Sequence, residues 1–204
     1  MALDDFYSNA VFFLRWFHII AGIMWIGMLY FFNFVNANFQ TTLAKELKPQ
    51  VNPELLHRAL FWFRWGAMFT FVLGWTLLFV KYSGGNLWYD AEGKFTHRAM
   101  WILFGGTLGS VMWFNVWFII WPAQKQILGW VKAAQSPPEM PALVKRATHA
   151  SKVNTYLSAP MLFGMIAPNN YGSINGLTLV ICIVVGCGVI WMAYKYAPKV
   201  TVPA

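Results

Sequence analysis

The chain has 204 residues, of which 58% are hydrophobic and 11% are charged. Soluble domains average about 25% charged residues, so this composition excludes an ordinary soluble protein and predicts an integral membrane protein. The formal net charge of +8 comes mainly from Lys and Arg beside apolar stretches. No polar segment combines a basic run with aromatic residues, so we expect no nucleic-acid partner.

The apolar stretches are long enough for transmembrane helices of about 20 residues. We predict an all-α integral membrane protein, a five-span helical bundle that forms a single domain over residues 1–204. Pairs of small residues four apart, Gly105 with Gly109 and Cys182 with Gly186, would let neighbouring helices approach closely. Pro122 is expected to end the third span. The predicted spans cover residues 11–36, 56–80, 97–121, 142–168 and 174–194.

The distribution of Lys and Arg predicts the orientation of the bundle. Ten of these residues lie in or beside the first loop, the third loop and the tail after the last span, whereas three lie around the second loop. Because cytoplasmic loops carry the excess of positive charge, we expect the N-terminus outside and the C-terminus in the cytoplasm.

Four histidines fall at two predicted depths of the lipid bilayer. His18 in the first span and His97 at the start of the third lie toward the outer face. His57 at the start of the second span and His149 in the polar half of the fourth lie toward the inner face. Helical bundles hold haem b between two such imidazoles, so we predict one haem b at His18 and His97. A second haem b at His57 and His149 is the weaker prediction.

Two arginines accompany these histidines within the apolar spans. Arg15 lies three residues before His18, and Arg64 lies inside the second span. Because guanidinium groups pair well with carboxylates, both are expected to bind haem propionates. All seven acidic residues lie outside the spans, which argues against a coupled transporter and against a carboxylate metal site.

A simpler interpretation of the polar residues needs no cofactor. A histidine inside a span or at its end can be hydrogen-bonded to a neighbouring helix. Asn33, Asn36 and Asn115 are expected to join helices in the same way.

Three stretches resemble the membrane-embedded N-terminal domain of the bacterial cytochrome-linked urate oxidase family. They are FHIIAGIMWIGMLYFFNFVN from Phe17, GGTLGSVMWFNVWFIIWPAQKQIL from Gly105 and NTYLSAPMLFGM from Asn154. The resemblance implies a multi-pass protein of a bacterial inner (cytoplasmic) membrane, from which electrons leave through haem to a c-type cytochrome. No C-x-x-C-H haem-attachment sequence occurs in these residues, so we expect no cytochrome c domain here, and Val153 stands where the family resemblance predicts a histidine before Asn154.

We therefore predict a haem b-binding membrane subunit that carries electrons within a larger respiratory or oxidoreductase complex. Its expected partners are the lipid bilayer, other membrane subunits and a c-type cytochrome. One alternative is a structural or accessory subunit without a cofactor. Another is a membrane oxidase that acts on urate, or on protoporphyrinogen, because the first span also resembles that of a small membrane haem protein with this activity.

Overall fold

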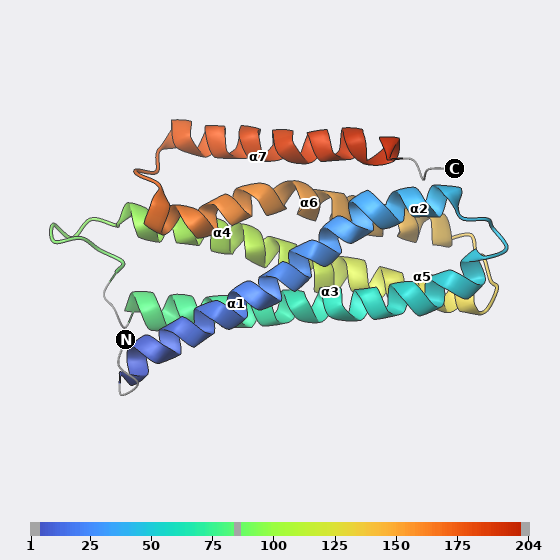
Figure 1. The fold of residues 1–204 in the computed structure, drawn as a ribbon, viewed down its shortest axis with the longest axis horizontal. Coiled ribbons are helices and arrows are strands. Elements are labelled where there is room, and N and C mark those ends of the chain that lie inside the picture. Colours follow the sequence, from blue (N-terminus) through green and yellow to red (C-terminus); the bar gives the residue numbers. More distant parts are fainter. Residues whose placement is uncertain (1–4, 84–86, 201–204) are drawn as a thin grey trace.

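The computed structural model describes residues 5–83 and 87–200, and in this part of the chain every regular element is helical (Figure 1). The predicted all-α class is confirmed. Five long helical segments run along one another in alternating directions within the described residues. The first three segments are α1 (Phe6–Tyr30) continued by η1 (Phe31–Asn36) and α2 (Ala37–Thr42), α3 (Lys48–Leu78) with η2 (Phe79–Ser83), and α4 (His97–Phe114) with η3 (Asn115–Ile120) and α5 (Trp121–Lys132). The last two are α6 (Met140–Asn170) and α7 (Gly176–Tyr196), followed by the short turn η4 (Ala197–Lys199).

The two ends of the bundle are named here by the chain terminus nearest to them. At the N-terminal end, α1, α4 and α7 begin and α3 and α6 finish (Figure 1). At the C-terminal end lie α2, the start of α3, α5, the start of α6 and the last turns of α7. The N-terminal end of the bundle is the end predicted to face outside, and the C-terminal end is the one predicted to face the cytoplasm.

Among the described residues, four helices are long and apolar enough to cross a membrane, which indicates a multi-pass membrane protein. We predicted five spans, and the fourth of these, at residues 142–168, does not meet the same criterion. It corresponds to α6, whose first half carries Lys145, Arg146 and Lys152 and whose polar side chains further along are buried inside the bundle. The four apolar helices are Phe6–Thr42, Lys48–Ser83, His97–Lys132 and Gly176–Lys199.

The helix α6 packs between α4 and α7 through residues too small to keep the backbones apart. A Cβ atom on Gly105 of α4 would lie 2.9 Å from the carbonyl carbon of Gly164 in α6. On the other side of α6, a Cβ on Gly186 would lie 3.0 Å from Cδ of Pro160. The predicted close approach at both small-residue pairs is therefore present, and α6 is the helix that both pairs contact.

The prediction that Pro122 ends the third span is wrong, because the helix continues to Lys132. The π-helical segment η3 (Asn115–Ile120) ends two residues before Pro122, and the amide of Trp121, just after it, donates to the carbonyl of Val116, five residues earlier. The wider π-helical turn changes the helical register, and Pro122 lies in the first turn of the helix that follows, α5. The first turn of a helix is the position at which proline is tolerated.

The contact between α4 and α6 predicts opposite effects for two neighbouring glycines of α4. Gly105→Ala places its methyl group against the α6 backbone and should lower the free energy of unfolding by about 1–3 kcal/mol. Gly106→Ala meets nothing within 4 Å and should raise it by about 0.5–1 kcal/mol through helix propensity. Thermal unfolding of both variants in detergent checks this. Equal destabilisation by the two changes would contradict the close approach.

Candidate functional site

His18 lies on α1 against the side of α3, toward the N-terminal end of the bundle. Its Nδ1 is 2.9 Å from the backbone carbonyl oxygen of Thr70, to which it donates when protonated. Gly74, one turn further along α3, makes room for the ring, since a Cβ atom there would lie 2.7 Å from Cε1 of His18. A half-buried ring held in this way keeps its proton on Nδ1 and leaves the lone pair of Nε2 available.

His97 is the first residue of α4 and is exposed. Its Nδ1 accepts a hydrogen bond of 3.3 Å from the amide of Ile174, in the connection between α6 and α7. A neutral ring that accepts at Nδ1 carries its proton on Nε2. His97 would have to give up this bond before either nitrogen of the neutral ring could ligate a metal.

His57 and Arg64 lie on one face of α3, and both contact the ring of Trp121. The His57 and Trp121 ring centroids are 6.3 Å apart, and the Arg64 guanidinium carbon lies 3.7 Å from the Trp121 centroid. The Nε of Arg64 is buried and has no hydrogen-bond partner in the described part of the chain. A buried guanidinium donor without a partner is rare, and it would readily accept an anionic group as its partner.

The remaining predicted residues, Arg15 on α1 and His149 on α6, are both exposed. The two histidines of the predicted outer pair are hydrogen-bonded to different segments. His18 is bonded to α3, and His97 is bonded to the connection between α6 and α7. Within residues 5–83 and 87–200, no group of three or more His, Cys, Asp or Glu side chains could hold a metal ion. The haem ligands therefore stay predictions, with His18 the best positioned of the four.

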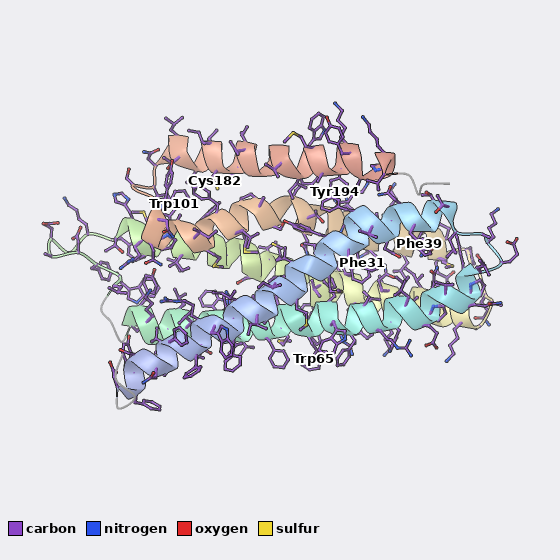
Figure 2. All side chains as sticks on the ribbon, viewed as in Figure 1. Phe31, Phe39, Trp65, Trp101, Cys182 and Tyr194 are labelled. Atoms are coloured by element: carbon purple, nitrogen blue, oxygen red, sulfur yellow. The ribbon has the colours of Figure 1, made fainter. Side chains whose placement is uncertain are left out.

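An apolar hollow of about 390 Å³ lies between α1 and α3. Its lining includes Phe17 and Ala21 on α1 and Phe69 and Leu73 on α3. His18 is not among the lining residues, because its ring packs against Thr70 and Gly74. Trp65 also lines the hollow and projects from the outer side of α3 (Figure 2). The hollow could accept a flat or extended apolar group but offers almost no hydrogen bonds.

A second and larger cavity, of about 540 Å³, lies at the C-terminal end of the bundle. All five helical segments contribute to its wall, and its lining combines aromatic, amide and hydroxyl side chains. Among the described lining residues Lys152 is the only cation, and none is acidic. Its polar lining residues are Asn33, Asn36, Asn38, Gln124, Thr148, Ser151, Lys152, Tyr156 and Tyr194.

A chain of hydrogen bonds fixes one wall of this polar cavity. The Tyr194 hydroxyl reaches from α7 toward α6 and α1 (Figure 2) and donates to Oδ1 of Asn33 over 2.8 Å. The Asn33 amide donates in turn to Ser151 Oγ over 2.8 Å and to the Leu29 carbonyl over 2.9 Å. The rings of Tyr156 and Tyr194 stack with centroids 5.6 Å apart. Asn33 thus links three helices, and both hydrogens of its amide nitrogen are used.

A pair of asparagines, Asn115 and Asn154, joins two helices deeper in the bundle. Asn115 donates to Oδ1 of Asn154 over 2.8 Å, and the Asn154 amide donates to the Met112 carbonyl over 2.9 Å. Asn33 and Asn115 both lie in π-helical segments, η1 and η3, and both are bonded to α6. Segments of this kind are frequent at functional sites, because they re-aim side chains that a regular helix would place elsewhere.

The sequence analysis assigned these asparagines to helix joining, which is confirmed for Asn33 and Asn115, but it did not find the cavity. One signal was present: the stretches that carry the family resemblance contain Asn33, Asn36, Gln124 and Tyr156, which all line it. Lys152 on α6 and Tyr194 on α7 lie outside those stretches. Their place in the cavity wall follows from the packing of α7 on α6, which the sequence did not predict.

Comparison with known proteins gives one match. The model of the family described as "Urate oxidase N-terminal" matches residues 86–197, more than half of the chain. No curated protein and no solved structure matches. The matched region includes α4 to α7, and with them Gln124, Ser151, Lys152, Tyr156 and Tyr194 of the polar cavity. The chain therefore belongs to the urate oxidase N-terminal family.

Proposed function

We propose that this chain is a haem b-binding membrane domain that carries electrons within a larger urate-oxidising assembly. Membership of the urate oxidase N-terminal family supports the assembly, and the position of His18 supports the cofactor. The other members of the assembly would be further membrane subunits and a c-type cytochrome, in a bacterial inner membrane.

The hydrogen bond from His18 Nδ1 to the Thr70 carbonyl is the observation that carries the haem proposal. Histidines that ligate metals almost always donate their other ring N–H to a carbonyl, carboxylate or water, which fixes the tautomer and the ring orientation. His18 has this arrangement on an apolar, aromatic-rich part of the bundle, and its sequence neighbour Phe17 lines the hollow between α1 and α3. The residues present thus fit one axial ligand.

Other side chains would position and neutralise the group. Arg64 fits a propionate carboxylate, because its buried Nε lacks a partner among the described residues and its guanidinium is already fixed over Trp121. Arg15 would serve at the level of His18. When bound, haem b supplies reversible one-electron transfer. His97 would become the second ligand only by releasing the Ile174 amide. The inner pair, His57 and His149, would hold a second haem.

The haem proposal predicts the effect of one methyl group on α3. Gly74→Ala would push against the His18 ring and should lower the haem affinity by about tenfold or more, as loss of a ligand-orienting contact typically does. His18→Ala should remove this haem. Haem per chain from pyridine haemochrome spectra, and the reduced-minus-oxidised Soret band, measure both effects.

Gly27→Ala is the matched control, because it adds the same methyl group at an exposed helix position with nothing within 4 Å. It should leave the haem content unchanged. Absence of a Soret band from the spectrum of the purified wild-type chain would refute the haem proposal. The same result would favour the rival function, an accessory subunit without a cofactor.

We also propose that α6 crosses the membrane as a fifth span, with the N-terminus outside. Its end is bonded to the start of α4, where Arg98 donates to Asn169 over 2.6 Å, and its start packs on α5 at the opposite end of the bundle. Polar side chains inside the bundle explain its low hydropathy, because they face other helices and need no contact with lipid.

Cysteine labelling in intact cells tests this topology. In a chain with Cys182 and Cys187 changed to Ala, a cysteine at Ser173 should react with an impermeant maleimide from outside. A cysteine at Gln135, at the other end of α6, should react only after the membrane is permeabilised. Reaction of both from the same side would show that α6 does not cross.

A further inference from the structure

The polar cavity at the C-terminal end has no part in the haem proposal at His18. Polar groups that face an apolar interior without hydrogen bonds cost free energy, so a polar hollow among apolar helices calls for a partner. We propose that this cavity binds a small planar organic anion that carries several hydrogen-bond acceptors.

The charge of the cavity favours an anion. Lys152 is the only cation among the described residues that line it, and its Nζ lies 5.9 Å from the centroid of the Tyr194 ring. None of those residues is acidic, and the one acid of α3, Glu54, lies 3.1 Å from Arg58, with which it pairs. The ammonium group therefore has no carboxylate in the cavity to neutralise it, and a bound anion would do so.

The free hydrogen-bonding groups favour a ligand rich in acceptors. The amide of Asn33 is fully used by its partners, and Oδ1 of Asn36 already accepts from Gln40. Within the described residues, no hydrogen bond is made by the amide nitrogen of Asn36, Oδ1 of Asn38, the side chains of Gln124 and Thr148 or the hydroxyl of Tyr156. With Lys152, these groups offer mainly donors.

The shape of the walls favours a flat ring. Phe32 and Phe63 meet edge to face with centroids 5.4 Å apart on one side, and the stacked rings of Tyr156 and Tyr194 form another side. The volume of about 540 Å³ lies within the range of roughly 300–1,000 Å³ for small-molecule sites. The described lining does not favour a zinc ion, because it contains no His, Asp, Glu or Cys.

Equilibrium dialysis of the purified full chain with two purines tests the site. Urate, an anion at neutral pH with several acceptor oxygens, should bind, whereas uncharged caffeine, with the same fused ring system, should bind at least about tenfold more weakly. The choice of urate as the probe rests on the proposed function. The lining residues alone define the class of ligand.

Two lysines of α6 provide a matched pair of variants. Lys152→Gln removes the charge from the cavity and should raise the Kd for urate by about tenfold or more, and Lys152→Arg should restore binding. Lys145→Gln removes an equally exposed charge from the same helix, outside the cavity, and should leave the Kd unchanged. Lys152 is exposed, so neither variant should impair folding.

The outcomes separate this inference from the haem proposal. Absence of urate binding, equal binding of caffeine, or equal Kd values for Lys152→Gln and Lys145→Gln would overturn the inference, whatever the haem content. Binding that depends on Lys152 in a chain without a Soret band would support the inference and refute only the haem proposal.

Discussion

The polar side of α6 has to be satisfied inside an apolar bundle, and much of the structure depends on this constraint. Asn154, Thr155 and Ser158 are fully buried. In a medium without water, each of their polar atoms needs a partner within the protein. Asn154 finds its partners on the α4–α5 segment, Thr155 bonds within α6 and Ser158 bonds within α6 and to Tyr30 of α1. The hydrogen bonds therefore hold α6 at the centre, between neighbours that supply the apolar surface.

The same constraint explains where the regular helices are interrupted. Asn33 and Asn115, which both bond to α6, lie in π-helical segments, and each segment leads into a further helix at the C-terminal end, α2 or α5. A π-helical turn changes the helical register, so the residues beyond it present a different face to the bundle. Asn36 after Asn33, and Gln124 after Asn115, thereby line the polar cavity. Asn33 and Asn115, which join the helices, thus also help to shape the polar cavity.

The sequence was sufficient to predict the helical class, the apolar helices and the contacts of the small residues. Length and composition determine the first two, and Gly105 and Gly186 contact α6 because only small residues fit there. The end of the third span was wrong, because the effect of Pro122 depends on a π-helical turn that no local pattern announces. The predicted fourth span, α6, is not among the four apolar helices of the described residues, because the polar side chains that it turns toward other helices lower its hydropathy. The hydrogen bond of His97 could not be predicted either, since the Ile174 amide that donates it lies 77 residues away in the chain.

The two proposed sites share α3 but are separated along it. Leu60 lines the polar cavity, whereas Thr70 bonds His18, and ten residues of α-helix span about 15 Å. Side chains at this distance with no shared partner act almost independently. His57 and Arg64 lie near the cavity end of this stretch, around Trp121, next to the cavity residues Ile120 and Gln124. Of the two predicted haem levels, the inner one is therefore the closer to the polar cavity. Arg64, whose buried Nε has no hydrogen-bond partner among the described residues, lies on α3 between Leu60 and Thr70.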